Sequence, residues 1–281
     1  MKKILVIIAV LLSLSVPKAN ASHFLGGEIT WECITSGINT GKLVFTFKLY
    51  CACYSGAASC PTSSVSIVNP LYGLYGGVST IVCNNILPGN QGTDLSPTCY
   101  NPTQQLSCGL SIGAGGNQAM KEYVFVSAPV QINGIPAVSG SVFDWSSCCR
   151  PTTLNLVGQG SYWIRAVMFP YTDPSTSTVL SNGSTTGGPT CYDSSPKFAE
   201  RPATVICSGY PFTYNHNAID SDLDSLKYEW TLPMQSATNP VLWQAGYNTM
   251  SQLPGTFHSS LNVPATMSPT TGEISFTTIV T

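Results

Sequence analysis

Charged side chains are scarce in this 281-residue chain, at 9% of all residues, with 11 Lys and Arg against 13 Asp and Glu. Ordinary globular proteins carry about 25%. Taking Lys2, Lys3 and Lys18 of the amino-terminal segment from the 11 basic residues leaves 8 against 13, a net charge of about −5. Because nucleic-acid affinity comes largely from Lys and Arg that neutralise phosphates, this shortage disfavours a nucleic-acid partner. The hydrophobic content of 43% is ample for a folded core.

The sequence also lacks the motifs of common metal and catalytic sites. It has no Cys-x2-Cys pair, and its three histidines, His23, His216 and His258, are scattered, which disfavours zinc. Gly-x-Ser-x-Gly occurs once, at residues 109–113, but in a Gly/Gln/Asn-rich segment rather than between an expected strand and helix, as a nucleophile elbow requires. We interpret the histidines as surface or turn residues and expect a protein that is not an enzyme. A secreted hydrolase is the alternative, and it would need two acids or a Ser–His pair that converge in one cleft.

Long hydrophobic runs are missing after Ala21, and the run that precedes it is short. Lys2 and Lys3 are followed by the apolar stretch Ile4 to Val16 and then by the small residues of Ala19-Asn20-Ala21. A stretch of about 13 residues is too short to cross about 30 Å of hydrocarbon as a helix. This pattern predicts a signal peptide over residues 1–21 and an exported protein.

Cysteine, by contrast, is abundant. Export together with this density predicts disulfides, and all eleven cysteines are candidates: Cys33, Cys51, Cys53, Cys60, Cys83, Cys99, Cys108, Cys148, Cys149, Cys191 and Cys207. Cys51 and Cys53 are not expected to bond each other, nor are the adjacent Cys148 and Cys149. Since eleven is odd, we expect one free thiol or one bond to another chain. The sequence does not fix the pairing.

Hydrophobic residues alternate with a period of two. In Lys42 to Tyr50, the side chains of Leu43, Phe45, Phe47 and Leu49 fall on one face. The same alternation occurs in residues 28–34, 121–128, 161–169 and 225–232, and no helical stripe follows Ala21. The pattern predicts an all-β protein of two immunoglobulin-like β-sandwich domains, stapled by disulfides.

Composition suggests where these domains begin and end. Residues 173–195 are rich in Gly, Ser and Thr and are expected to form a linker or long loop between a sandwich over 22–172 and a second over 196–281. The Gly/Pro/Gln/Asn-rich segment 87–117 predicts a long disulfide-stapled loop. Residues 273–281 are expected to form a strand without a partner. We therefore expect that the natural protein continues, or that a partner chain completes the sheet by strand addition.

Two groups of residues are candidates for ligand binding. Asp220, Asp222 and Asp224 place three carboxylates at alternate positions; we interpret them first as a solvated turn between strands, and a site for a hard cation such as Ca²⁺ is the alternative. Five tryptophans lie in or beside the expected strands, where most belong to a core: Trp31, Trp145, Trp163, Trp230 and Trp243. Tyr72, Tyr75 and Tyr100 lie in Gly/Pro-rich stretches and are candidates to face a ligand, and a sugar-binding platform would need two or three coplanar rings.

Several motifs are similar to those of one bacterial family. Residues 22–31, Ser-His-Phe-Leu-Gly-Gly-Glu-Ile-Thr-Trp, resemble the opening of large secreted Bacteroidetes surface proteins, among them gliding-motility adhesins and proteins with a gliding-motility-associated C-terminal domain. Further similar segments follow in order: 49–53, 148–150, 195–198, 202–207, 211–214 and 218–228. Residues 267–274 resemble a hairpin of cadherin-like and immunoglobulin-like repeats. Three positions depart from the family pattern: Cys51, which is either an extra thiol or half of an added bridge, Trp230 in place of Cys, and Leu223 in place of Gly.

This resemblance implies a non-catalytic adhesion or docking region at the outer surface of a Gram-negative bacterium, exported by the type IX system. The implied partners are an outer-membrane protein or cell-surface apparatus, and glycans. A carbohydrate-binding module of a secreted polysaccharide-degrading system is the alternative function, and a passive spacer is a third.

Overall fold

The computed structural model describes residues 24–52, 60–68, 78–96, 107–108, 119–132, 136–148, 150, 153–158, 160–173, 175–180, 193–202 and 206–279. The expected signal peptide lies outside these residues, as do His23, Tyr72, Tyr75 and Tyr100. Within the described part, regular structure is almost entirely antiparallel β, which confirms the all-β prediction. No helix among the described residues is long and apolar enough to cross a membrane.

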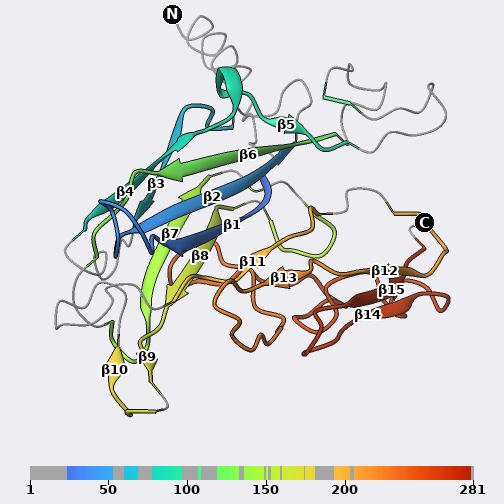
Figure 1. The fold of residues 1–281 in the computed structure, drawn as a ribbon. Coiled ribbons are helices and arrows are strands. Elements are labelled where there is room, and N and C mark those ends of the chain that lie inside the picture. Colours follow the sequence, from blue (N-terminus) through green and yellow to red (C-terminus); the bar gives the residue numbers. More distant parts are fainter. Residues whose placement is uncertain are drawn as a thin grey trace, which may run out of the picture.

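Eight strands form one sheet in the amino-terminal part, with the order β1-β2-β6-β4-β3-β7-β8 and with β5 paired to β6 (Figure 1). They are β1 (Phe24–Cys33), β2 (Leu43–Ala52), β3 (Ser64–Val68), β4 (Thr80–Asn85), β5 (Thr93–Asp94), β6 (Met120–Ser127), β7 (Ser141–Ser147) and β8 (Tyr162–Met168). Among the described residues a single pair, Val68 with Asp144, joins β3 to β7. β8 also packs against β1, so the sheet folds back on itself where β3 meets β7 and encloses a core.

The alternating side chains of β2 supply the centre of that core. Leu43, Phe45, Phe47 and Leu49 are all buried, as the sequence predicts. Phe45 packs against Phe143 of β7 with ring centroids 4.9 Å apart, and Phe47 packs against Trp145 at 5.1 Å. These aromatic contacts between β2 and β7 hold the two halves of the sheet together.

Gly27 lets the first and last strands of the sheet meet. A Cβ atom at this position would lie 2.5 Å from the carbonyl oxygen of Lys48 and 2.8 Å from Cδ1 of Ile164 in β8. No larger residue therefore fits without moving a strand. Beside this contact, Phe24 packs edge-on against Tyr162, with ring centroids 6.2 Å apart.

The carboxy-terminal part is built from shorter strands and long irregular segments. β9 (Tyr171–Thr172) and β10 (Val179–Leu180) form a small hairpin at the beginning of the segment 173–195 that was expected to be a linker or loop; β9 lies just before that segment. β11 (Lys197–Phe198) pairs with β13 (Ala218–Ile219), and β12 (Phe212–Tyr214), β14 (Val263–Met267) and β15 (Ile274–Thr277) form a three-stranded sheet.

Two strand predictions in this part are wrong. Residues 225–232 alternate like a strand but join no ladder; the backbone N–H of Tyr228 donates to the carbonyl of Pro269 instead. β15 was expected to lack a partner, yet it lies in the middle of its sheet and pairs with β12 and β14. Alternation of apolar and polar residues indicates an extended segment with one apolar face. It does not indicate whether a neighbouring strand lies close enough to pair with that segment.

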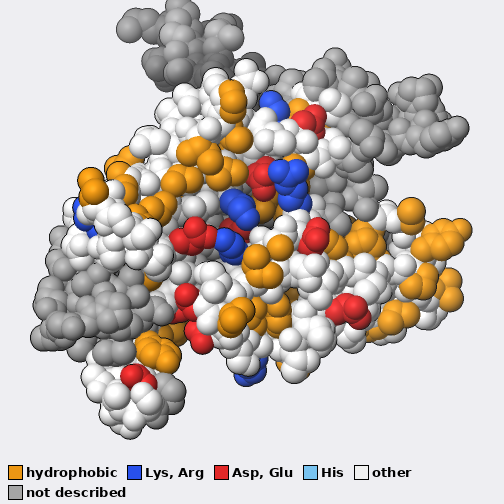
Figure 2. Space-filling view, viewed as in Figure 1, with side chains coloured by type: hydrophobic (Ala, Val, Ile, Leu, Met, Phe, Trp, Pro, Cys, Tyr) orange, Lys and Arg blue, Asp and Glu red, His pale blue; other side chains and the backbone are white. Residues whose placement is uncertain are grey.

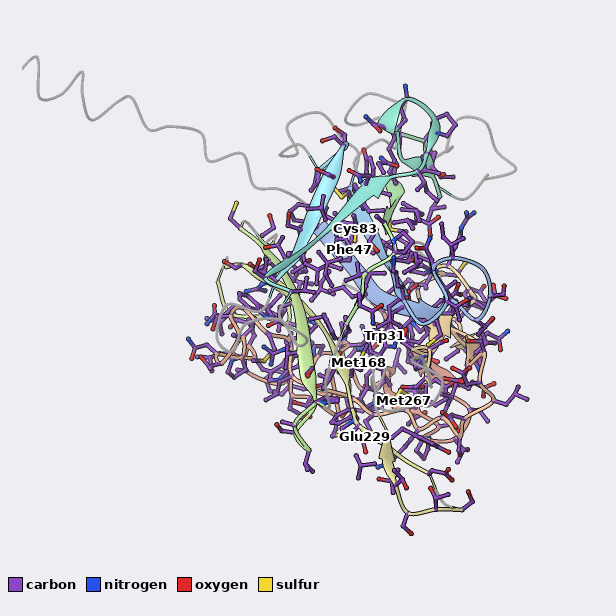
Figure 3. The ribbon with its side chains drawn as sticks, turned by 60° about the vertical axis from the view of Figure 1, so that its left-hand side comes forward. Trp31, Phe47, Cys83, Met168, Glu229 and Met267 are labelled. Carbon is purple, nitrogen blue, oxygen red and sulfur yellow. A yellow bond between two sulfur atoms is a disulfide. The ribbon has the colours of Figure 1, made fainter. Side chains whose placement is uncertain are left out.

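The disulfides agree in part with the expectation. Cys51 bonds Cys60, so Cys51 is half of a bridge rather than an extra thiol, and Cys33, Cys108 and Cys148 are disulfide-bonded as well. Cys83 and Cys207 are free, which corrects both their assignment as disulfide candidates and the expectation of a single free thiol. Cys83 is fully buried in the apolar core, with its Sγ 4.0 Å from the Phe45 carbonyl oxygen. Figure 3 shows it near Phe47. The remaining candidates, Cys53, Cys99, Cys149 and Cys191, lie outside the described residues.

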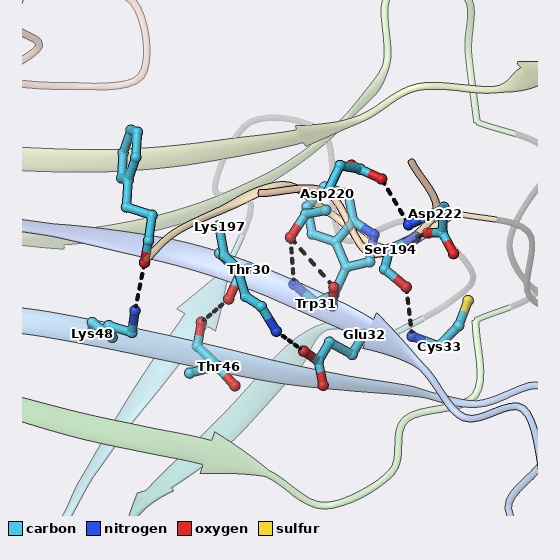
Figure 4. Close-up of polar contacts among 12 residues, drawn as sticks. Thr30, Trp31, Glu32, Cys33, Thr46, Lys48, Ser194, Lys197, Asp220 and Asp222 are labelled. Atoms are coloured by element: carbon cyan, nitrogen blue, oxygen red, sulfur yellow. Dashed lines mark hydrogen bonds and ion pairs between the residues drawn. The ribbon is translucent and has the colours of Figure 1, made fainter. Parts of the chain in front are cut away.

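Residues 193–198 connect the two parts along the outer edge of β1. The backbone N–H of Trp31 donates to the hydroxyl of Ser195 at 2.8 Å, and the backbone N–H of Ser195 donates back to the Trp31 carbonyl at 3.0 Å. The N–H of Cys33 donates to the Ser194 hydroxyl at 3.2 Å (Figure 4). These contacts satisfy backbone groups that an edge strand would otherwise leave unpaired.

Candidate functional site

Three adjoining pockets follow the joint between the two parts of the protein. The largest, here called the aromatic pocket, has a volume of about 380 Å³ and is lined by Pro202, Ile206, Phe212, Tyr214, His216, Trp230, Gln252, Leu253, Ala265, Ile274 and Phe276. The second, the junction pocket, has about 260 Å³ and is lined by Leu25, Gly26, Gly27, Glu28, Tyr50, Met120, Phe198, Glu200, Pro202 and His216. Because both include Pro202 and His216, we treat them as one cleft. A third pocket of about 150 Å³ shares Glu28 and Phe198 with the junction pocket.

Strand geometry explains why rings line the aromatic pocket. Successive side chains of a strand point to opposite faces, so Phe212 and Tyr214 share one face of β12 and Thr213 takes the other. On the neighbouring strand, Ile274 and Phe276 pair with Tyr214 and Phe212 and line the same pocket. The three-stranded sheet therefore presents an apolar, ring-bearing face to the cleft.

The rings continue from one pocket into the next. The ring centroids of Phe276 and Phe212 are 5.2 Å apart, and those of Phe212 and Tyr214 are 6.3 Å apart, with planes within 15° of parallel. Tyr214 and His216 follow at 4.7 Å, and His216 and Phe198 at 4.7 Å. These five rings, which we call the ring row, run along the cleft from the aromatic pocket to the junction pocket.

Ion pairs gather at the junction pocket. The Lys48 ammonium lies 2.7 Å from Oε1 of Glu28 and 3.4 Å from the Phe198 carbonyl, and Arg201 lies 3.2 Å from Oε2 of the buried Glu122. Figure 2 shows acidic and basic side chains side by side at the centre of this face. Burial and the carboxylates of Glu122 and Glu28 raise the pKa of Tyr50 far above its usual value, so its hydroxyl stays protonated.

The hydrolase alternative would need two acids in one cleft, and two carboxylates, those of Glu28 and Glu200, line the junction pocket. Both oxygens of Glu28 are engaged, Oε1 by Lys48 and Oε2 by the backbone N–H of Phe198 at 3.3 Å. Glu200 is exposed and forms no ion pair with the other described residues. The carboxylate of Glu28 is therefore already bonded within the protein, whereas that of Glu200 is accessible and can accept hydrogen bonds from a ligand.

The acidic turn is arranged differently from the sequence expectation. Carboxyl oxygens of Asp220 and Asp224 lie within 4.8 Å of each other and of one from Asp193, while Asp222 instead accepts a hydrogen bond from the backbone N–H of Ser194. Burial, followed by the negative charges of the turn, raises the pKa of Asp193 to about 6. Oxygen ligands of this kind suit Ca²⁺, and calcium binding stays a prediction. Leu223 in this turn adopts a left-handed φ of 65°, a conformation that favours Gly.

The other predicted residues lie at separate places. Trp31 and Trp145 belong to the core as expected, but Trp230 lines the aromatic pocket. His258 packs against Tyr247, with ring centroids 4.5 Å apart. His216 differs from its interpretation as a surface or turn residue, because it is half-buried at the centre of the cleft, where burial lowers its pKa.

Sequence reasoning did not single out Tyr50, Phe198, Glu200 or Asp193. Glu200 carries no motif of its own, and Asp193 is distant in sequence from the acidic turn. The segments that resemble the bacterial family, 22–31, 49–53, 195–198, 202–207 and 211–214, do include residues that line the cleft, but the resemblance gave them no role in a pocket. Comparison of the chain with protein-family models, with curated proteins and with solved structures finds no match.

Proposed function

We propose that this chain is a non-catalytic, extracellular adhesion or docking region of a bacterial cell-surface protein of the gliding-motility adhesin type. It is exported to the outer surface of a Gram-negative bacterium and binds an outer-membrane partner or a surface. The supporting observation is the cleft itself: a ring-lined depression in the carboxy-terminal part that continues into the joint with the amino-terminal part, where Glu28 and Glu122 are paired with Lys48 and Arg201.

The construction of the joint supports a binding role. Contacts at Trp31, Cys33 and Glu28 tie residues 193–198 to β1, so the two walls of the cleft are held in place before a ligand arrives. Preorganised walls reduce the ordering cost of binding. Disulfides such as Cys51–Cys60 suit a protein that works outside the cytoplasm.

The fold assignment within this proposal is two immunoglobulin-like sandwiches. For the amino-terminal part, its support is the single residue pair between β3 and β7, where the sheet turns into a second layer. For the carboxy-terminal part, its support is the three-stranded sheet, which buries Ala265 and turns one apolar face inward.

Affinity capture tests the function directly. The oxidised mature chain, residues 22–281, is immobilised and incubated with outer-membrane fractions from a gliding Bacteroidetes species and with abiotic surfaces and glycans. We expect retention of a defined outer-membrane partner or surface, and surface exposure of the native protein in intact cells by protease shaving. Binding to none of these, or a location inside the cell, would contradict the proposal.

A further inference from the structure

The apolar face of the three-stranded sheet is incompletely covered. Phe212, Tyr214, Ile274 and Phe276 line a space of about 380 Å³. Protein interiors are packed about as densely as organic crystals, so a space of this size on an inward-facing sheet is not ordinary packing. It falls within the range of about 300–1,000 Å³ that ligand pockets occupy.

The chemistry of the aromatic pocket limits what can fill it. Among the described residues, its lining contains no Asp, Glu, Lys or Arg. Its polar side-chain groups are the imidazole of His216, the amide of Gln252, the indole of Trp230 and the hydroxyl of Tyr214, which already donates to the Arg201 carbonyl. Because burial lowers the pKa of His216, its imidazole is neutral at neutral pH and can both donate and accept. The pocket therefore suits an uncharged ligand with apolar faces and hydroxyl edges.

The ring row favours an extended ligand: Phe212 and Tyr214 are near parallel, at 15°, and supply two coplanar rings, while His216 stands edge-on to Tyr214, at 87°. Aromatic rings recur at 5.2, 6.3, 4.7 and 4.7 Å between neighbouring centroids and lead from Phe276 to Phe198 across both pockets. A compact apolar molecule would need the first pocket alone. A chain of sugar rings instead presents C–H faces that pack on aromatic rings at each unit and hydroxyls that bond polar groups between them.

The charged end of the cleft adds a further restriction. Glu200 is exposed at the junction pocket, whereas Glu28, the other carboxylate that lines it, is paired with Lys48, and the neighbouring Arg201 is paired with Glu122. Carboxylates accept hydrogen bonds from hydroxyl groups and repel anionic ligands. We infer that the cleft formed by the aromatic and junction pockets binds a neutral oligosaccharide, with its sugar rings along the ring row and its hydroxyls on Glu200. This inference rests on the proposed adhesive function and names the ligand class of its site.

Binding of purified oligosaccharides to the oxidised mature chain tests the inference. Hexasaccharides of β-linked glucose, xylose and mannose are titrated calorimetrically, with oligogalacturonate as the anionic comparison. We expect at least one neutral hexasaccharide to bind and oligogalacturonate to bind at least tenfold more weakly. Phe198→Ala is expected to lower the affinity at least tenfold. Tyr171→Ala is the matched control, because both rings are 40% exposed and Tyr171 lines neither pocket.

Glu200→Gln provides a variant on the surface whose folding is not at risk. It keeps a hydrogen-bond acceptor and removes the charge, so it should change affinity for the neutral ligand less than fivefold and reduce the discrimination against oligogalacturonate. Absence of binding to all neutral hexasaccharides, binding of an apolar dye alone, or equal affinities of the Phe198 and Tyr171 variants would overturn the inference. If the chain still captures an outer-membrane partner in that case, the proposed function stands without its glycan ligand; if it captures nothing, both fail.

Discussion

The ion pair between Asp144 and Arg165 gives a sharp prediction of stability. Asp144 lies in β7 directly opposite Arg165 in β8. Nε and Nη2 of the guanidinium each donate to a different carboxylate oxygen at 2.8 Å, and Nη2 also donates to the carbonyl of Ala237 at 3.2 Å. The two side chains are unequally exposed, Asp144 at 1% and Arg165 at 31%. Removing one partner should therefore not cost the same as removing the other.

The magnitude follows from that asymmetry. Arg165→Leu leaves a carboxylate buried without its partner, and removing one partner of a buried pair costs about 3–5 kcal/mol. Partial exposure of Arg165 admits some solvent, so we expect a loss of about 2–4 kcal/mol in the free energy of unfolding. Asp144→Leu leaves a guanidinium that can reach water and should cost about 1–2 kcal/mol. The double variant should be more stable than Arg165→Leu, because no unpaired charge remains buried.

Urea unfolding of the oxidised protein, followed by tryptophan fluorescence, measures these differences as a double-mutant cycle. The slope of free energy against urea should stay constant, so that changes in midpoint report stability. Glu32→Gln is the surface control: Glu32 pairs with Lys197, both are exposed, and its loss should stay below about 0.5 kcal/mol. The reasoning is refuted if Asp144→Leu costs more than Arg165→Leu, or if the double variant is the least stable of the three.

Three further predictions concern the cysteines and the acidic cluster. Replacing Cys51 and Cys60 by Ser should lower the free energy of unfolding by about 2.5 kcal/mol in calorimetry, because their bond closes a loop with a sequence separation of 9; an unchanged melting temperature would contradict this. In the native protein a maleimide should label the exposed Cys207 and leave Cys83 unmodified until urea unfolds the core, since burial raises the pKa of Cys83 to about 12; rapid native labelling of both would be inconsistent with the structure. In the folded protein the pKa of Asp193 is about 6, above its ordinary 3.8. The ionised carboxylate therefore lowers the free energy of unfolding above pH 6, and this loss disappears as the pH falls from about 6 towards 4. Asp193→Asn should accordingly raise the free energy of unfolding by about 1 kcal/mol at pH 7.5, after allowance for solvent screening, and by nothing near pH 4; added Ca²⁺ should stabilise the native protein more than this variant if the cluster binds calcium.

The sequence identifies the long strands well and the short ones poorly. The alternation of Leu43, Phe45, Phe47 and Leu49 marks β2 because all four face one buried core. Residues 225–232 alternate in the same way, with Tyr228 over Gly272 and Trp230 in the aromatic pocket, but no neighbouring strand is in place to pair with them. Side-chain pattern depends on burial, whereas a ladder depends on tertiary neighbours.

The cleft and the acidic cluster depend on contacts between distant residues. The backbone N–H of Phe198 reaches Glu28 across 170 positions, and the sequence motifs that contain these two residues do not indicate that they meet. Asp220 and Asp224 were visible as a local cluster, but Asp193 joins them through the fold. The odd number of cysteines predicts a free thiol but does not identify it: Cys51 and Cys83 are both buried, and only Cys51 has a cysteine within bonding distance, Cys60.

The hydroxyl groups that cover the outer edge of β1 have a consequence for the order in which the chain can mature. Ser194 and Ser195 come more than 160 residues after the amides they bond. While the chain is synthesised from the amino terminus, the strand would have its ladder on one side and bare amides on the other until these serines emerge. During that interval the nascent chain is vulnerable to pairing with a second copy of itself, so its escape from aggregation depends on how quickly the later residues follow.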